Sequence, residues 1–184
     1  MSFVFNQDNQ QRAKVILARY PKDWQRSALL PLLDLAQRQN DNWLSVQAME
    51  YVAELVGVPY ITAYEVASFY TMFNLKPVGR YLLQVCRTTP CWLCGSDDVL
   101  RAIKEVTGLT AHGESSKDGL FTLMEVECLG ACVNAPMMQI NDDYYEDLNY
   151  DHTRAILQAL TEGKTPKPGS QSGRHTCEPQ PEAG

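Results

Sequence analysis

Residues 118–136, DGLFTLMEVECLGACVNAP, place a strand-like segment directly before two cysteines. The first part of the stretch alternates apolar and polar residues, which is typical of a half-buried strand. Cys128 and Cys132 follow it, and Gly130 between them allows the backbone to bend tightly and to turn amide N–H groups toward sulfur. The stretch therefore predicts a strand that ends in a loop with two sulfur ligands.

A second cysteine loop lies upstream in a similar setting. The segment RYLLQVC indicates a short strand that ends in Cys86, and Cys91 and Cys94 follow in the next loop. Taken with the distant Cys128, these three cysteines have the C-x4-C-x2-C spacing of plant-type ferredoxins. The alternative set combines Cys86 and Cys91 with Cys128 and Cys132, and leaves Cys94 outside.

Two features favour the alternative set. Each of its cysteine pairs follows a predicted strand, and neighbouring strand ends can bring two loops to opposite sides of one metal centre. A plant-type loop needs small residues, whereas this loop contains Pro90, Trp92 and Leu93. Thiolate donors suit iron–sulfur or zinc and disfavour magnesium or calcium. Pairs separated by three or four residues also suit a structural zinc site, so spacing alone does not choose between the two metals.

The remaining pattern predicts two domains and a tail, in the α/β (α+β) class. Residues 1–76 carry apolar positions at helical spacing and predict a small helical domain. Residues 77–163 indicate strand, helix, strand, strand, strand, helix, which predicts a mixed sheet with helices packed on it. Residues 164–184 are rich in Pro, Gly and polar residues, so we expect an extended or disordered tail that only a partner would order. Cys177 in this tail is interpreted as incidental.

Local signals predict several boundaries within these domains. Ser45 and Ser96 are expected to cap helices, and Asp23 is expected to begin a helix in which Pro31 marks a kink or the true start. The pair Asn141–Asp142 predicts the turn of a hairpin.

Composition excludes several classes of function. A net charge of −6 disfavours nucleic acid as a partner, because phosphate backbones need a basic surface. No apolar run approaches the roughly 20 residues that cross a bilayer, and no secretory signal is evident, so we expect no direct membrane insertion. A reducing compartment favours free or metal-bound thiols over three disulfides. The aromatic residues Tyr64, Phe69, Tyr70 and Phe73 are interpreted as core packing, with a subunit interface as the alternative.

Residues 118–136 resemble the signature of the 24 kDa (NuoE-type) subunit family of respiratory complex I, the NADH:quinone oxidoreductase. The segments YPKDWQRSALLPLLDLAQ, YEVASFYTMF, PVGRYLLQVCRTTPC and NDDYYEDL are similar to other blocks of that family, and the likeness runs from about residue 13 to residue 174. The resemblance implies a small N-terminal helical bundle followed by a thioredoxin-like [2Fe–2S] domain with a mixed sheet. It also implies one [2Fe–2S] cluster per chain.

The ligands that this resemblance implies are Cys86, Cys91, Cys128 and Cys132, in agreement with the second set. We expect the backbone amides of four residues to donate hydrogen bonds to sulfur, with Gly130 providing the bend: Arg87, Thr88, Thr89 and Ala131. Cys94 departs from the family, which usually carries a non-cysteine residue there, often arginine. We expect Cys94 to lie beside the cluster without binding it.

The resemblance further implies an electron-transfer subunit of NADH dehydrogenase, without a complete active site of its own. FMN and NADH would be bound by a neighbouring 51 kDa-type subunit, and the other peripheral-arm subunits would be further partners. The expected location is the cytoplasmic side of the bacterial inner membrane, or the matrix side in a mitochondrion. Three alternatives are a diaphorase subunit of an NAD-linked hydrogenase or formate dehydrogenase, a free-standing thioredoxin-like ferredoxin, and a zinc-stabilised interaction protein.

Overall fold

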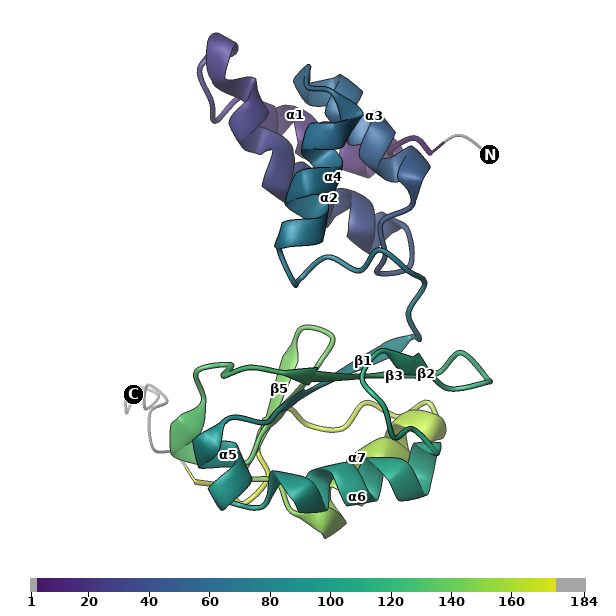
Figure 1. Cartoon of the computed structure of the whole chain (residues 1–184), viewed down its shortest axis with the longest axis vertical. Helices are drawn as coiled ribbons and strands as arrows, with labels where there is room; N and C mark the ends of the chain where they lie inside the picture. The colour runs from purple at the N-terminus through teal and green to yellow at the C-terminus, as the bar shows by residue number, and fades with distance from the viewer. Residues whose placement is uncertain (1–2, 175–184) are drawn as a thin grey trace, which may run out of the picture. The chain divides into compact units, whose positions relative to one another are not determined.

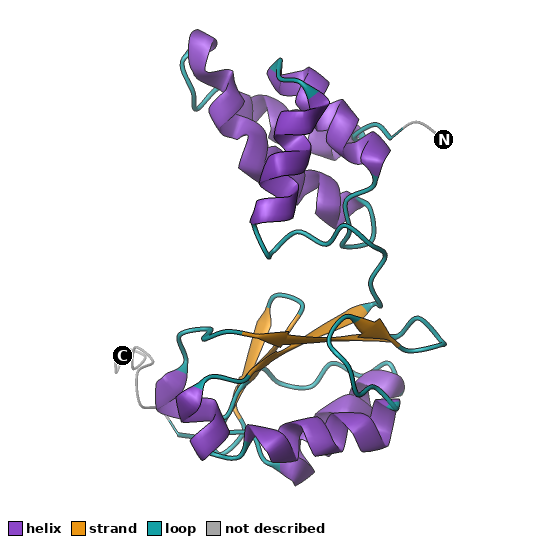
Figure 2. Cartoon of the chain, in the orientation of Figure 1, coloured by secondary structure: helices purple, strands orange, loops and turns teal. Residues whose placement is uncertain are grey.

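The computed structural model describes residues 3–174. The chain divides between Val78 and Gly79 into two compact units (Figure 1). The first unit is helical and the second contains the strands (Figure 2), which confirms the α/β class. The predicted domain bounds, residues 1–76 and 77–163 with a tail of residues 164–184, stay a prediction. Among the described residues, no helix combines the length and the apolarity needed to cross a bilayer.

Buried apolar side chains hold the helical unit together. Its helices are α1 (Gln7–Leu17), the 3₁₀ helix η1 (Lys22–Ala28), α2 (Leu29–Gln39), α3 (Val46–Val56) and α4 (Tyr60–Phe69). Leu32 and Leu33 of α2 share one buried cluster with Val52 of α3 and Ala63 of α4. Each fully buried leucine contributes roughly 1.5–3 kcal/mol, so the buried leucines of α2 stabilise this unit strongly.

The boundaries of these helices follow only some of the local signals. Ser45 caps α3 as predicted, accepting a backbone hydrogen bond at 3.2 Å, and Gly57 ends the helix in the left-handed region at φ +71°. Asp23 does not cap a long helix, because residues 22–28 form η1 instead. Pro31 lies in the first turn of α2, where its missing N–H has no helical partner to lose.

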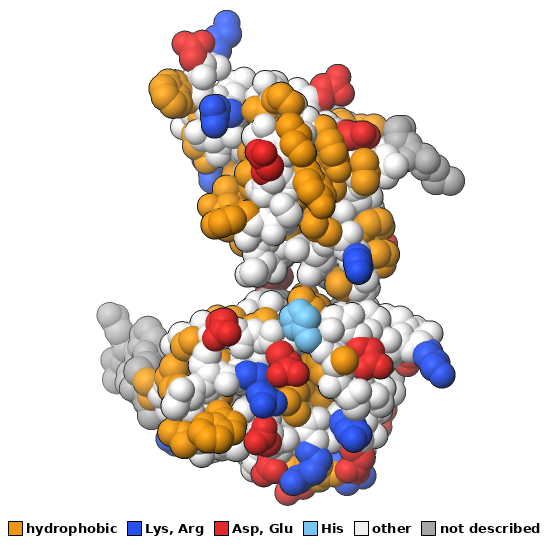
Figure 3. All heavy atoms as spheres, in the orientation of Figure 1, with side chains coloured by type: hydrophobic (Ala, Val, Ile, Leu, Met, Phe, Trp, Pro, Cys, Tyr) orange, Lys and Arg blue, Asp and Glu red, His pale blue; other side chains and the backbone are white. Residues whose placement is uncertain are grey.

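The aromatic residues on and after α4 are mostly exposed. Phe73 is buried, but Phe69 is 77% exposed, and Tyr64 and Tyr70 are also exposed. The interpretation as core packing is therefore wrong for three of the four residues, because α4 is apolar on both its buried and its outer faces. Figure 3 shows hydrophobic side chains across one face of this unit.

In residues 79–174, a mixed sheet forms with the strand order β2-β3-β1-β4-β5-β6. The strands are β1 (Tyr81–Cys86), β2 (Glu114–Ser115), β3 (Phe121–Val126), β4 (Met138–Ile140), β5 (Asp143–Glu146) and β6 (Gly169–Ser170). β1 runs parallel to β3, and β5 runs parallel to β6, while the other neighbours are antiparallel. The parallel pairing places the ends of β1 and β3 at the same edge of the sheet.

Helices cover one face of this sheet. The chain passes from β1 through α5 (Thr89–Leu93) and α6 (Ser96–Thr107) to β3, and later through the 3₁₀ turn η2 (Cys132–Asn134) and α7 (Tyr150–Thr161). Figures 1 and 2 show α6 and α7 side by side beneath the strands. Ile103 of α6 and Leu157 of α7 share a buried cluster with Leu83 and Leu123 of the sheet.

Two turn predictions have opposite outcomes. Asn141 adopts a left-handed conformation at φ +53° between β4 and β5, as the hairpin requires. Ser96 is not a cap, since Gly95 at φ +99° takes that position between α5 and α6. Ser96 is instead the first residue of α6 and is buried, and its hydroxyl finds no hydrogen-bond partner among the described residues.

The segment after α7 is ordered by its own chain. Gly169 pairs with Tyr145, and Ser170 pairs with Glu146, so β6 extends the sheet beyond β5. The expectation that only a partner would order the tail is therefore wrong for these residues. Cys177 lies outside the described residues.

Candidate metal centre

The cysteine loops meet because of the register between β1 and β3. Cys86 is the last residue of β1 and lies opposite Val126, the last residue of β3. Cys91 follows in α5, and Cys128 comes just after β3. Since both strands end at one edge of the sheet, the loops that follow them lie next to each other.

The first pair of cysteines is buried. Cys86 and Cys91 form a small core with Met137, against which Leu129 of the second loop packs. The Thr88 hydroxyl lies 3.3 Å from the Cys86 sulfur. The phenol of Tyr144 donates to the Leu129 carbonyl at 2.9 Å, which ties the second loop to β5.

The second pair of cysteines is exposed. The sulfurs of Cys128 and Cys132 lie 3.4 Å apart, and the Gly130 N–H donates to the Cys128 sulfur at 3.4 Å. Gly130 has φ +84°, in the left-handed region that favours glycine. The bend predicted between these two cysteines is therefore present, and it directs an amide toward sulfur.

The thiols influence one another across the two loops. Burial acts to raise the pKa of Cys86, but hydrogen bonds from Thr88, Cys91 and the Leu129 amide outweigh it and leave that pKa lowered. Burial, together with Cys86 and Cys132, raises the pKa of Cys91 to about 12.

In the exposed pair, too, neighbouring thiols change the pKa of a cysteine. The hydrogen bond with Cys128 is the main cause that raises the pKa of Cys132, followed by burial and the charges of Cys128 and Cys86. If these cysteines lost their protons, the thiolates would repel one another, and binding to metal cations would relieve that repulsion.

Residues 13–161 match the family model of the thioredoxin-like [2Fe–2S] ferredoxins. The chain belongs to the thioredoxin-like [2Fe–2S] ferredoxin family. The E subunit of NADH-quinone oxidoreductase from Rickettsia bellii (strain RML369-C) is 58% identical over 159 residues, which cover 86% of this chain and 95% of the relative. The same-named protein of Rickettsia prowazekii (strain Madrid E) is 59% identical over 165 residues, covering 89% and 93%. These relatives confirm the resemblance to the complex I family.

Two more distant likenesses agree with this family. "NADH dehydrogenase (ubiquinone) flavoprotein 2, mitochondrial" of Dictyostelium discoideum is 52% identical over 176 residues, covering 96% of this chain and 71% of that protein. A crystal structure of an NAD+-reducing [NiFe]-hydrogenase superposes with a TM-score of 0.63 at 19% identity, over 71% of this chain and 22% of the hydrogenase chain. The hydrogenase likeness shows a shared fold.

The four cysteines suit the iron–sulfur cluster for which the family is named. Within residues 3–174, no three His, Cys, Asp or Glu side chains converge at the distances that one metal ion requires. A structural zinc site draws four sulfurs around one point, whereas a [2Fe–2S] cluster divides its four ligands between two irons. The sulfurs lie as two pairs, one from each loop, which matches the second arrangement.

Several expected neighbours of the sulfurs need revision. The Thr88 hydroxyl, rather than only its amide, lies beside the Cys86 sulfur, and the Arg87 N–H donates to the Val126 carbonyl at 3.1 Å and extends the β1–β3 pairing. The amides of Leu129 and Met137 reach Cys86 and Cys91 instead, which the spacing of the cysteines could not indicate. The roles of two other expected donors, Thr89 and Ala131, stay predictions.

Charged and exposed apolar side chains surround the first cysteine loop. The Arg87 side chain lies 3.3 Å from Asp97 and 3.7 Å from Glu125, so both carboxylates balance its charge. Cys94 ends α5 and is exposed. Hydrophobic side chains gather near α5 (Figure 3), where Trp92 and Leu93 are 55% and 71% exposed.

Proposed function

We propose that this chain is the electron-transfer subunit of an NADH:quinone oxidoreductase and carries one [2Fe–2S] cluster on four cysteines: Cys86, Cys91, Cys128 and Cys132. The observation that carries the proposal is the meeting of two cysteine pairs at the ends of the parallel strands β1 and β3. The names of the complex I relatives support it.

The donor set favours electron transfer over bond-making chemistry. Four thiolates leave a [2Fe–2S] cluster without an open position for substrate, and the cluster supplies a site that accepts and returns one electron. The chain tunes such a site through N–H groups near sulfur, of which the Gly130 amide is the clearest example. The buried pair, Cys86 and Cys91, anchors the centre, while the exposed pair faces outward.

The exposed side of the site suits a protein partner. Trp92, Leu93 and Val133 are large apolar side chains left exposed beside the two loops. Such patches mark protein interfaces. We propose that an FMN- and NADH-binding 51 kDa-type subunit covers this surface and exchanges electrons with the cluster through its flavin.

Further contacts would involve other peripheral-arm subunits, to which the exposed aromatic side chains of α4 offer a second apolar surface. The proposed location is the cytoplasmic side of a bacterial inner membrane, or the matrix side of a mitochondrial one. The diaphorase subunit of an NAD-linked hydrogenase or formate dehydrogenase differs from this proposal in its partners, so partner identity separates the two.

Anaerobic purification of the tagged full-length chain with its partners tests the proposal. We expect a brown protein with equal amounts of iron and acid-labile sulfide, accompanied by a flavoprotein and further subunits of a membrane-bound quinone reductase. NADH should produce the EPR signal of the reduced cluster only when the flavoprotein is present. A colourless chain with stoichiometric zinc, or a hydrogenase as the sole partner, contradicts the proposal.

A further inference from the structure

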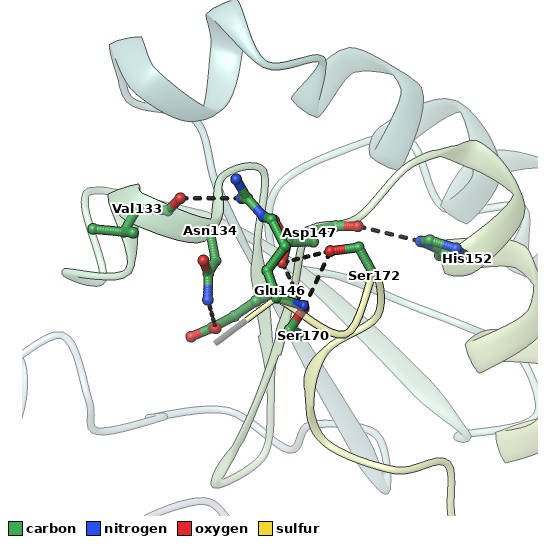
Figure 4. Close-up of polar contacts among 8 residues, drawn as sticks. Val133, Asn134, Glu146, Asp147, His152, Ser170 and Ser172 are labelled. Atoms are coloured by element: carbon green, nitrogen blue, oxygen red, sulfur yellow. Dashed lines mark hydrogen bonds and ion pairs between the residues drawn. The ribbon is translucent and has the colours of Figure 1, made fainter. Parts of the chain in front are cut away.

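The end of β5 connects two segments that are far apart in the sequence (Figure 4). Glu146 and Asp147 form this junction. The Asn134 side-chain amide donates to the Glu146 carboxylate at 2.7 Å, and the Asp147 N–H donates to the Asn134 carbonyl at 2.7 Å. The turn that begins with Cys132 is therefore attached to the junction through its last residue.

The C-terminal segment is attached to the same junction. The Ser170 hydroxyl donates to the Asp147 carboxylate at 2.6 Å, and the Ser172 hydroxyl donates to the same oxygen at 3.0 Å. The Gln171 N–H donates to the Glu146 carbonyl at 3.0 Å. These bonds hold β6 and the residues after it against β5.

Arg174 joins the two attachments directly. Its guanidinium pairs with the Asp147 carboxylate, and the same nitrogen, Nη2, donates to the Val133 carbonyl at 3.1 Å. Its backbone N–H donates to the Ser170 hydroxyl at 3.0 Å. Val133 directly follows Cys132, so the Arg174 side chain holds the backbone beside a cysteine of the second loop.

The negative charge of Asp147 and the positive charge of Arg174 stabilise each other at this junction. The Asp147 side chain is only 7% exposed, and a carboxylate that is buried without a partner is costly. Burial alone acts to raise the pKa of Asp147, but hydrogen bonds from Arg174, Ser170 and Ser172 outweigh it and leave the pKa lowered. The bond with Asp147 is the main cause that raises the pKa of Arg174.

We propose that Arg174, held by Asp147, is a positioning residue for the cluster site: it fixes Val133, and with it the loop of Cys132, and it keeps a positive charge beside this second cysteine loop. The inference rests on the proposed role of Cys132 as a ligand. A fixed loop binds the cluster more tightly, and a nearby cation favours the more negative, reduced state of the cluster.

Three variants of the full-length, cluster-loaded chain test this positioning role. Arg174→Gln removes the positive charge and the guanidinium that bonds both Asp147 and Val133, whereas Arg174→Lys keeps the charge. We expect Arg174→Gln to release iron to a chelator up to about tenfold faster, the lower end of the effect of losing a direct outer partner of a metal ligand, because Arg174 acts on Val133, next to Cys132. Its reduction potential should also fall, and Arg174→Lys should return the potential toward the wild-type value. Asp147→Asn, which removes the charged acceptor, should also accelerate release.

Lys167→Gln is the matched control, because it removes one positive charge from the same exposed C-terminal segment and changes none of the side chains that bond Asp147 or Val133. We expect wild-type release and potential from this control. The proposal is overturned if either measurement on Arg174→Gln equals that of Lys167→Gln. If Arg174→Gln does not accumulate as folded protein, Asp147→Asn decides, and a release rate equal to the control's overturns the proposal.

A measurement on the metal-free chain separates this inference from the proposed function. Hydrogen exchange of the Asp147 amide reports on its bond to the Asn134 carbonyl, whether or not a cluster is bound. We expect faster exchange in Arg174→Gln and no change in Lys167→Gln. Failure of the wild-type chain to bind iron and sulfide would refute the proposed function, whereas unchanged exchange in Arg174→Gln would refute the positioning role.

Discussion

Replacing Gly79 by alanine should weaken the pairing of β1 with β3, on which the meeting of the cysteine loops depends. A Cβ atom at Gly79 would lie 2.7 Å from the carbonyl carbon and 2.8 Å from the nitrogen of Phe121. Both contacts are with backbone, so no side-chain rotation relieves them. The Gly79 N–H also donates to the buried Thr122 hydroxyl at 2.6 Å, and a shift that opens space would lengthen this bond.

The magnitude follows from these two effects. Forcing an extra carbon into packed backbone costs about 2 kcal/mol, and loss of the buried hydrogen bond costs about 1 kcal/mol more. Alanine recovers roughly 0.5–1 kcal/mol through the lower entropy of the unfolded chain. The steric cost dominates, so the free energy of unfolding of the second unit should fall by about 2 kcal/mol, which corresponds to roughly 30-fold faster amide exchange.

Hydrogen exchange of the β1 and β3 peptides in the metal-free chain measures this change separately from the helical unit. Gly163→Ala is the matched control, since its Cβ would meet open space and only the left-handed φ of +74° is strained. We expect this control to cost about 1 kcal/mol, with its effect confined to the end of α7. Exchange in Gly79→Ala within threefold of the wild-type rate refutes the steric argument.

The remaining predictions concern the surroundings of the site. Ser96→Ala should leave the metal-free fold as stable or up to about 1 kcal/mol more stable in urea unfolding, because the buried hydroxyl has no partner among the described residues, and a clear loss of stability contradicts this reasoning. Gly130→Ala should cost about 1–2 kcal/mol through its φ of +84° and should lower the yield of bound iron; an unchanged yield indicates that the bend is not needed. The lowered pKa of Asp147 means that its carboxylate adds stability above its unfolded-state pKa and loses this contribution as pH falls through the lower folded-state pKa. The protection factors of the β6 amides, which compare each exchange rate with the intrinsic rate at the same pH, should therefore be smaller in acid than at neutral pH in wild type, and Asp147→Asn should remove this pH dependence; a dependence that persists in the variant assigns it to another group.

The sequence predicts the cysteine loops because their signals are local. The predicted strands and the glycine between two cysteines depend only on the residues near them. β1 ends in Cys86, β3 ends two residues before Cys128, and Gly130 provides the bend. Ser45 and Gly57 predict the ends of α3 for the same reason.

The remaining features depend on contacts between distant residues. Gly169 and Ser170 have no apolar alternation, so nothing local indicates a strand, and β6 exists because β5 offers a free edge and Asp147 offers an acceptor. The amide of Leu129 reaches Cys86 only after β1 and β3 have paired. The aromatic residues of α4 were predicted wrongly as core because an apolar pattern does not show whether the core of the same chain or a partner covers that face.

The most direct test of the central claim is the EPR signal and iron content of three cluster-loaded chains prepared anaerobically and then reduced: wild type, Cys132→Ser and Cys94→Ser. We predict a [2Fe–2S] signal of wild-type intensity in Cys94→Ser, because Cys94 lies outside the two sulfur pairs. Cys132→Ser should lose the cluster or give a signal with altered g values, because one of four sulfur ligands is replaced. A wild-type signal from Cys132→Ser, or loss of the cluster from Cys94→Ser alone, would contradict the assignment.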